Sequence, residues 1–306
     1  MAIGFVPEGL ADSRADTGAA RLFGISRSRV EHAAERGRLL MDGVAITKSE
    51  KLRAGAMLEM EIEERSVQIR PALVEGMTIV YDDADLIVVD KPAGIAAHPS
   101  LGWEGPSVVE HLTAAGFELC ASGPPERKGI VSRLDVGTSG LMVVAKSEMA
   151  YAALKSAFRD RDVHKIYHAL VQGYPEPEAG VIDAPIGHAR TGEWKMAVDP
   201  AGRESVTHYS SIRTLFKATL LKVRLETGRT HQIRVHMAAI HHPCVGDLLY
   251  GADPVLADQV GLSRQWLHAV ELGFVHPRSG EEMVFTSGYP DDLAHCLDVL
   301  ASVPAR

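Results

Sequence analysis

Short runs in which apolar and polar residues alternate dominate the pattern along the chain, and helical stretches are few. Residues 58–62 (LEMEI) and 221–225 (LKVRL) alternate apolar with charged side chains, as half-buried β-strands do. Residues 86–90 indicate a further strand that runs into a Pro-Gly turn. Ser147 is placed to cap a helix that extends through Phe158. The pattern predicts an α+β fold with a mixed, mainly antiparallel sheet and peripheral helices.

The N-terminal part follows a different pattern, with two short helices ahead of the strands. Residues 19–23 read as one helix, and Ser26 can cap a second helix that Gly37 ends. Residues 40–46 (LMDGVAI) indicate a hairpin with an Asp-Gly turn. The chain therefore begins with a small α/β module of its own.

Length and composition agree with two domains of unequal size. The chain has 306 residues, of which 46% are apolar, an ordinary share for a globular protein with a sizeable core. We place the small domain at residues 10–65, a linker at 66–77 and the large domain at 78–302. Apolar runs such as residues 141–145 are far shorter than the roughly 18 residues that span a bilayer. The N-terminus lacks the pattern of a signal peptide, so we expect a cytoplasmic protein with no membrane partner.

Cysteine spacing and charge narrow the functional classes further. Cys120, Cys244 and Cys296 lie far apart, which indicates buried free thiols rather than a disulfide framework or a thiolate zinc cluster. The formal net charge is −8, yet residues 12–53 carry nine Lys and Arg against six Asp and Glu. Nucleic-acid binding depends on where the basic groups lie rather than on their sum. The basic module keeps that class open.

Three segments carry the candidate chemistry. Residues 131–140 (VSRLDVGTSG) place Asp135 two positions after Arg133 and directly before a Gly-Thr-Ser-Gly turn. Such a string is weak evidence by itself, because most carboxylates beside turns only cap backbone N–H groups. Residues 165–173 (KIYHALVQG) and the arginine-rich turn at 226–236 (ETGRTHQIRVH) follow it. The joint occurrence of the three segments, in this order, is far more specific than any one of them.

Together with residues 242–251 (HPCVGDLLYG), these segments resemble the RluA-type pseudouridine synthases. The family also opens its catalytic domain with a K-P-x-G turn, found here at residues 91–94, and the resemblance covers about residues 10–300. It implies an enzyme that isomerises uridine in RNA without a cofactor or a metal. The sequence departs from the family at Ser132, where a histidine usually precedes the arginine, so any contribution of that imidazole to packing or RNA contact is missing.

Asp135 is the carboxylate that the resemblance assigns to catalysis. The reaction breaks the C–N glycosidic bond, turns the bound base and joins its C5 to the sugar. An ionised carboxylate can attack the sugar carbon or remove a sugar proton, and the sequence leaves both routes open. Burial would raise the pKa of such a carboxyl, so a cation must lie close to keep it charged. Arg234 is the candidate, because in the family the arginine of the Q-[IL]-R segment pairs with the aspartate, and a guanidinium suits bidentate contact.

The resemblance also assigns residues that would handle the target nucleotide. An enzyme that acts on a base inside structured RNA must flip it out of the stack, at a cost of a few kcal/mol. Arg133 would fill the gap, and Tyr167 would stack on the flipped uracil, with a gain of about 1–3 kcal/mol. Arg229 would serve an RNA phosphate. The plain alternative for Tyr167 is a strand aromatic in the core.

The basic N-terminal module resembles the S4 RNA-binding domain. The R-x-D opening of that domain corresponds to residues 14–16, and residues 24–29 (GISRSR) match its basic second helix, which faces structured RNA. The arginines that would contact RNA are Arg14, Arg27, Arg29, Arg36 and Arg38. The alternative is a solubilising role, since Arg27 and Glu31 also form an ordinary i,i+4 pair.

RNA is the predicted partner, and the two-domain layout resembles the branches that modify large-subunit ribosomal RNA. We therefore expect 23S ribosomal RNA or its precursor as substrate. No side-chain code for one uridine can be read, because RNA recognition depends on folded shape and loops. Nothing in the sequence demands more than a monomer.

Two other functions remain open. A non-catalytic RNA-binding or ribosome-assembly factor would have no need of Asp135, Arg133, Tyr167 and Arg234, which count against it. A metal-dependent hydrolase would draw its ligands from His231, His236, His241, His242 and Cys244. Metal-binding pairs on a helix favour i,i+4 spacing, whereas the first two of these histidines are five residues apart.

Overall fold

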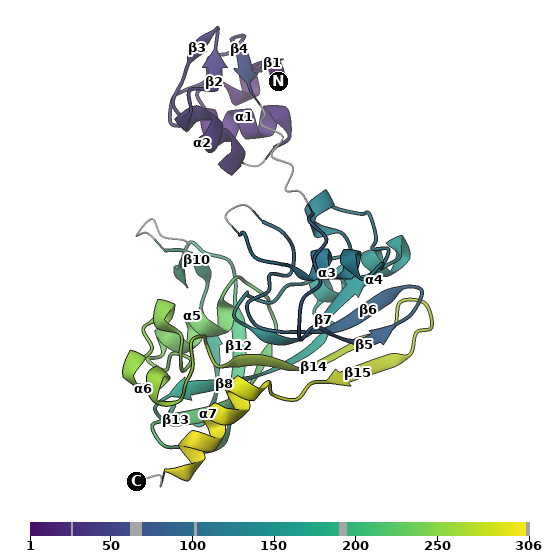
Figure 1. Cartoon of the computed structure of the whole chain (residues 1–306). Coiled ribbons are helices and arrows are strands. Elements are labelled where there is room, and N and C mark those ends of the chain that lie inside the picture. The colour runs from purple at the N-terminus through teal and green to yellow at the C-terminus, as the bar shows by residue number, and fades with distance from the viewer. Residues whose placement is uncertain (26, 62–68, 101–102, 190–194, 304–306) are drawn as a thin grey trace. The chain divides into compact units, whose positions relative to one another are not determined.

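The chain divides into two compact units, Met1–Ser66 and Val67–Arg306, in the computed structural model (Figure 1). The structure describes residues 1–25, 27–61, 69–100, 103–189 and 195–303. Each unit has its own hydrophobic core, so each is described by itself.

The N-terminal unit combines two helices with an antiparallel sheet in the strand order β1-β4-β2-β3. Its elements are β1 (Ala2–Phe5), a 3-10 helix (Glu8–Leu10), α1 (Ala15–Phe23), α2 (Arg27–Glu35), β2 (Leu39–Met41), β3 (Val44–Ala45) and β4 (Met57–Met60). Ala19 and Val30 of the helices meet Leu39 and Leu58 of the sheet in one buried core. The unit is thus a small α/β module, and β1 extends it ahead of residue 10.

The local predictions for this unit hold with small shifts. Both helices form, although α1 begins at Ala15, four residues before the predicted start, while the proposed cap Ser26 lies outside the described residues. The hairpin turn is confirmed, because Asp42 and Gly43 have φ values of 52° and 78° and a type I′ turn needs positive φ at both positions. Strand β4 begins one residue earlier than predicted and ends at Met60, and the predicted end at Ile62 is not among the described residues.

The C-terminal unit is built on a nine-stranded sheet in the order β5-β6-β7-β14-β8-β13-β12-β9, with β15 paired to β14. The strands are β5 (Thr78–Asp82), β6 (Leu86–Lys91), β7 (Ser139–Ala145), β8 (His164–Gln172), β9 (Ala179–Asp183), β12 (Val206–Leu215), β13 (Ala218–Leu225), β14 (Leu267–Val275) and β15 (Glu282–Thr286). Strands β7 and β14 run parallel, and the other neighbouring pairs among the described strands are antiparallel. The predicted mixed, mainly antiparallel sheet is confirmed.

Helices lie at both ends of this sheet, with α3 and α4 over the β5 to β7 end and α5 and α6 at the other (Figure 1). The remaining elements are α3 (Val108–Ala114), a 3-10 helix (Pro125–Arg127), α4 (Glu148–Asp160), β10 (Ile186–His188), β11 (Met196–Val198), α5 (Gln232–Ala239), a 3-10 helix (Leu248–Tyr250), α6 (Pro254–Gln259) and α7 (Asp291–Ser302). No described helix is both long enough and apolar enough to cross a membrane.

The unbroken apolar runs become strands that are covered on both faces. In β7, Leu141 and Val143 face the core that contains Leu154 of α4, whereas Met142 and Val144 face the core that contains Leu112 of α3. Side chains alternate across a strand, so a strand buried on both faces needs apolar residues at every position. This burial fixes the position of β7, whose first residue follows the Asp135 loop.

Two further predictions of local structure are confirmed. Ser147 caps α4 by accepting a hydrogen bond from the backbone N–H of Ala150, at 3.1 Å. The helix runs two residues beyond the predicted end at Phe158. In β13, Leu221 and Val223 are buried while the charged residues between them are exposed. The three cysteines are buried and free, as expected.

Candidate active site

Asp135 lies in a loop whose backbone is held from several sides. The loop carbonyl of Val136 accepts hydrogen bonds from the Gly94 amide at 2.8 Å and from Lys91 Nζ at 3.4 Å. The next carbonyl, of Gly137, accepts one from Arg264 Nη1 at 3.0 Å. These contacts tie the loop to the end of β6 and to the segment before β14, and so limit where the carboxylate can point.

Gly140, the second residue of β7, is required because two backbone segments approach each other closely. Gly140 has a φ of 113°, and a Cβ there would meet the carbonyl oxygen of Ala269 in β14 at 2.3 Å. Only glycine tolerates both the conformation and the contact. The Gly-Thr-Ser-Gly string thus lets β7 pair closely with β14 directly after Asp135.

Lys91 is a buried residue of the site that sequence reasoning treated only as part of a turn. Its Nζ donates to the carbonyls of Ile95 at 2.8 Å and Pro92 at 3.0 Å, besides that of Val136. Burial lowers the pKa of Lys91 to about 7, against the opposing effect of the Asp135 charge. Its position after the apolar run 86–89 and directly before the Pro-Ala-Gly turn was the signal that could have identified it.

Arg234 faces Asp135 from helix α5, but its bidentate partner is another carboxylate. Nη1 lies 3.4 Å from Asp135 Oδ2, whereas Nε and Nη2 donate to Asp247 at 2.6 and 2.8 Å. Burial lowers the pKa of Arg234, and the hydrogen bonds and charge of Asp247 more than offset this, so the pKa lies above its ordinary value. The expected bidentate contact with Asp135 was therefore wrong, because Asp247 takes two of the guanidinium nitrogens.

Tyr250 supports the same guanidinium from its other side. Arg234 Cζ lies 4.9 Å from the centre of the Tyr250 ring, within range of a cation–π contact. Asp247 and Tyr250 both belong to the segment 242–251, which resembles the family in sequence, but the sequence analysis gave these two residues no role. The match of that segment was the signal that pointed to them.

Tyr167, on β8, lies at the junction of a small pocket and a larger cleft. The pocket has a volume of about 60 Å³ and is lined by Asp135, Tyr167, Arg234 and His231, among others. Tyr167 is half-buried and also packs against two cores, so the position serves the fold as well as the pocket. Burial raises the pKa of Tyr167, and the nearby Asp135 raises it further. The phenol is therefore protonated at neutral pH.

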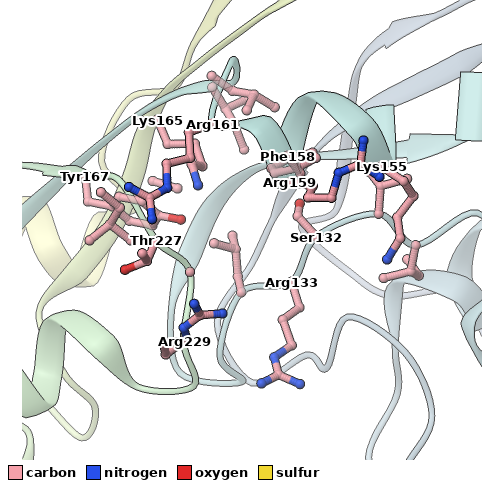
Figure 2. A pocket seen from close by; sticks show the side chains of 18 of the residues that line it. Ser132, Arg133, Lys155, Phe158, Arg159, Arg161, Lys165, Tyr167, Thr227 and Arg229 are labelled. Atoms are coloured by element: carbon pink, nitrogen blue, oxygen red, sulfur yellow. The ribbon is translucent and has the colours of Figure 1, made fainter. Parts of the chain in front are cut away.

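The larger cleft is basic, although the protein as a whole is acidic. It has a volume of about 530 Å³, and Asp135 does not line it. It shares Arg133, Tyr167, Leu225 and Arg229 with the small pocket, so the carboxylate lies at its edge. Figure 2 shows several of its cationic side chains. The basic residues that line it are Arg127, Arg133, Lys155, Arg159, Arg161, Lys165 and Arg229, against Glu226 and Glu271. The cleft thus concentrates positive charge where a polyanion could reach Asp135.

Arg133 and Arg229 lie on the wall common to both cavities (Figure 2). The exposed Arg133 donates to the hydroxyl of Thr230, and Arg229 Nε donates to the carbonyl of Glu204 at 3.0 Å. Ser132, which stands where the family carries histidine, is half-buried and lines the cleft. The geometry places both arginines within the mouth of the pocket, while their roles toward RNA stay predictions.

In the N-terminal unit, two of the five predicted RNA-binding arginines hold a buried carboxylate. Arg14 and Arg27 each place Nη2 2.8 Å from Asp16 Oδ2, and Asp16 is fully buried. The Arg14 guanidinium, and then Arg27, keep the pKa of Asp16 well below its usual range. The R-x-D pattern therefore has a structural role in the fold.

The other three arginines of that set lie elsewhere on the unit. Arg29 and Arg36 are exposed, and Arg38 is half-buried with Nε 3.6 Å from Glu61. The i,i+4 contact between Arg27 and Glu31 that was weighed as an alternative is present at 3.2 Å. A role in RNA contact stays a prediction for all five.

The histidines considered as metal ligands point in different directions. His236 bonds Thr207 Oγ1 at 2.8 Å and the carbonyl of Ala184 at 2.9 Å, and His242 bonds the carbonyl of Gln172 at 2.7 Å. In the described part of the chain, the group with metal-like spacing is Asp83, Asp85 and His276. Arg278 already binds Asp85 there through Nε and Nη2. Neither these histidines nor the group of Asp83, Asp85 and His276 favours a metal-dependent hydrolase.

The sequence and the fold of this chain are similar to those of known proteins. Residues 85–239 match the family model described as RNA pseudouridylate synthase. The chain is 55% identical, over 96% of each sequence, to an uncharacterized RNA pseudouridine synthase of Mycobacterium bovis. The chain therefore belongs to the RNA pseudouridine synthase family, and it is a pseudouridine synthase, an isomerase.

Further relatives indicate the branch of the pseudouridine synthase family to which the chain belongs. The chain is 40% identical to the ribosomal large subunit pseudouridine synthase D of Vibrio cholerae, with 92% of this chain and 89% of that protein covered. The structure is similar to that of human RNA pseudouridylate synthase domain containing 1, with a TM-score of 0.58, 26% identity, and 78% and 99% of the two chains covered. The relatives thus place the chain in the RluA-type branch of the family.

Proposed function

We propose that this enzyme isomerises uridine to pseudouridine in large-subunit ribosomal RNA, with Asp135 as the catalytic carboxylate. The observation that carries the proposal is the approach of Arg234 Nη1 to Asp135 Oδ2, at 3.4 Å, in a pocket that Tyr167 also lines. The guanidinium of Arg234 places a positive charge beside the carboxylate that would attack the sugar carbon or remove a sugar proton. The names of the relatives at about 40% identity support ribosomal RNA as the substrate.

In this proposal the small pocket would bind the flipped uracil, and the cleft would bind the RNA backbone on either side of it. Arg133, at the mouth of the pocket, would enter the RNA stack as the target uridine leaves it. The ring of Tyr167 would then stack on the uracil beside Asp135. Arg229 and the basic wall of the cleft would bind phosphates on either side of the flipped nucleotide.

The N-terminal unit would act as a second RNA contact. Its helix pair and small sheet, together with the R-x-D pattern at Arg14, support the S4-like assignment of residues 10–65. The linker at 66–77 would join it to the catalytic domain at 78–302. A ribosomal RNA substrate also agrees with the cytoplasmic location and monomeric state expected from the sequence.

The direct test is release of tritium from 23S ribosomal RNA labelled at uridine C5, because forming the new bond expels that hydrogen. Wild type should release tritium without added metal or cofactor, and Asp135→Asn should release none while it binds RNA nearly as well. Asp258→Asn is the matched control, since this carboxylate is exposed on α6 and outside both cavities. Turnover by Asp135→Asn would overturn the catalytic assignment.

A null result from the wild type would favour the alternative of a binding or assembly factor. Where the wild type does release tritium, mapping the modified position in the product RNA tests the identity of the substrate separately from the reaction. Modification of a small-subunit RNA or a transfer RNA, with 23S RNA left untouched, would contradict the substrate but not the chemistry.

A further inference from the structure

His231 lines the Asp135 pocket, and the proposed function gives it no role. It precedes helix α5 in the left-handed conformation, with a φ of 58°, and its side chain does not cap the helix. Residues other than glycine adopt this backbone conformation at a cost in free energy, so the surrounding structure must hold His231 in it. The left-handed turn aims the imidazole into the pocket, where its side chain is 19% exposed.

The imidazole lies between Asp135 and Tyr250. Nε2 is 3.9 Å from Asp135 Oδ2, the same oxygen that Arg234 approaches, and Nδ1 is 2.8 Å from the Tyr250 hydroxyl. The Tyr250 ring packs edge-on against the imidazole, with 5.6 Å between ring centres. One nitrogen is therefore engaged by the protein, while the other faces the carboxylate.

The bond to Tyr250 is compatible with a proton on the Nε2 nitrogen of His231. The Tyr250 hydroxyl oxygen accepts a hydrogen bond from the Met196 amide at 3.2 Å, so its own hydrogen is available for His231 Nδ1. A neutral imidazole that accepts at Nδ1 carries its proton on Nε2. This arrangement leaves an N–H donor directed toward Asp135.

The charges around His231 favour the neutral ring. Burial lowers the pKa of His231, and Arg234 and Arg133 lower it as well. Asp135 and Asp247 act in the opposite direction without cancelling the effect of burial. At neutral pH the ring is thus a neutral donor rather than a second cation beside the carboxylate.

The gap between the two groups suits one kind of substrate atom. At 3.9 Å, Nε2 and Oδ2 are too far apart for a direct hydrogen bond. A single oxygen can lie beside both, about 2.8 Å from each. That oxygen must accept from Nε2–H and donate to the carboxylate, and a hydroxyl group does both.

We propose that His231 donates a hydrogen bond from Nε2 to the 2′-hydroxyl of the target ribose, which in turn donates to Asp135. The inference rests on the proposed function, because it assumes that Asp135 acts on the sugar of the flipped uridine. The 2′-hydroxyl is bonded to the carbon next to the anomeric carbon, so holding it on Oδ2 brings the glycosidic bond to the same carboxylate. The contact also separates RNA from DNA at the one nucleotide where the chemistry occurs.

The test compares two RNAs and two histidine variants. A 23S RNA fragment that wild type modifies is prepared with ribose or with 2′-deoxyribose at the mapped uridine, and dissociation constants are measured for wild type and His231→Ala. His231→Ala should weaken binding of the ribose fragment about tenfold and leave binding of the deoxy fragment nearly unchanged. His231→Gln, which keeps an N–H donor, should restore part of the loss.

A matched control tests whether substitution of a histidine with a left-handed backbone weakens RNA binding by itself. His241 also has a left-handed φ, 65°, but it is exposed and lies outside both cavities. His241→Ala therefore imposes a similar strain without touching the pocket, and it should bind both fragments as wild type does. Thermal unfolding of the variants reports whether the fold is intact.

The outcomes separate this inference from the proposed function. An equal loss on both fragments, no loss on either, or a His231→Gln variant as weak as His231→Ala would overturn the role of His231 while tritium release by the wild type continued. Equal affinity of the wild type for the two fragments would likewise overturn the 2′-hydroxyl contact. Failure of the wild type to release tritium would instead count against the proposed function.

Discussion

Arg234 binds Asp247 through two guanidinium nitrogens, at 2.6 and 2.8 Å, and reaches Asp135 with the third. Asp247 is almost fully buried, so the pair neutralises an arginine that could not otherwise lie in the interior. The guanidinium of Arg234 is thereby fixed in orientation, with Nη1 directed at Asp135.

We expect Asp247→Asn to damage both stability and catalysis. Removal of one partner leaves a buried charge without compensation, which costs about 3–5 kcal/mol in the free energy of unfolding. Arg234 would also be free to turn toward Asp135, and kcat/KM in the tritium assay should fall by at least about a hundredfold. Urea unfolding and the release assay measure the two effects.

The matched control for Asp247→Asn is Asp42→Asn, at an exposed ion pair with Arg53. Exposed pairs contribute about 0–1 kcal/mol, so this variant should unfold and react nearly as wild type does. Equal effects of the two substitutions would contradict the role given to Asp247.

Substitutions of Tyr167 should separate the ring from the hydroxyl. Tyr167→Phe keeps the aromatic face and should bind RNA as tightly as wild type. Tyr167→Leu loses base stacking, at a cost of about 1–3 kcal/mol in binding free energy. If the hydroxyl moves a proton late in the reaction, the Phe variant should also turn over more slowly. Fluorescence anisotropy with labelled RNA gives the affinities, and equal weakening by both variants would rule out stacking.

The basic cleft predicts a salt dependence that can be assigned to single residues. Lys155 is exposed on α4 and lines the cleft. If it neutralises one phosphate of the bound strand, Lys155→Ala should reduce the slope of log affinity against log salt by about 0.7–0.9. Arg213→Ala, an exposed change on β12 outside the cleft, should leave the slope unchanged. No dependence on salt in the wild type would contradict RNA binding by the cleft.

His268 predicts a loss of stability in mild acid. It is buried against Ser139 and Ser287, and burial, followed by Arg264 and His168, lowers its pKa to about 4. Between pH 6.5 and 4 the unfolded chain binds a proton that the folded chain does not, so stability falls as the pH falls. From this residue alone the loss between pH 7.5 and 5 is about 2 kcal/mol.

Two variants are compared to isolate the contribution of His268 to the pH dependence of stability. This comparison is needed because other buried histidines also make stability fall as the pH falls. Urea unfolding at both pH values should show a dependence smaller by about 2 kcal/mol in His268→Asn than in wild type. His32→Asn, an exposed change on α2, should leave the dependence as it is. An unaltered dependence in His268→Asn would show that the residue is not buried neutral.

Asp16 predicts a local effect in the N-terminal unit. Because Arg14 and Arg27 both bind this buried carboxylate at 2.8 Å, Asp16→Asn should destabilise that unit by about 1–3 kcal/mol. Hydrogen exchange should rise in α1 and α2 while the catalytic unit keeps its protection. For the same reason, Arg14→Ala or Arg27→Ala would loosen the fold of this unit as well as any contact with RNA. Faster exchange across the large sheet would contradict this prediction.

Much of the local structure could be read from the sequence because the signals are short in range. The Ser147 cap, the Asp42-Gly43 turn and the alternation in β13 depend on residues only a few positions apart. The positions of Asp135, Tyr167 and Arg234 around one pocket could be anticipated only through the resemblance of whole segments, since no periodicity relates residues so distant in the chain.

The amino-acid sequence alone identifies the chemical groups of the site: the carboxylate, the arginines, the aromatic ring and the glycines that permit the tight turns. The pairing of these groups depends on the tertiary structure. Asp247 rather than Asp135 takes the bidentate contact of Arg234, Lys91 at the end of β6 binds the Asp135 loop through the Val136 carbonyl, and His231 turns toward Asp135. These relationships depend on strands and helices that meet across the sheet, and burial of several charged groups at one point selects the arrangement in which each finds a partner.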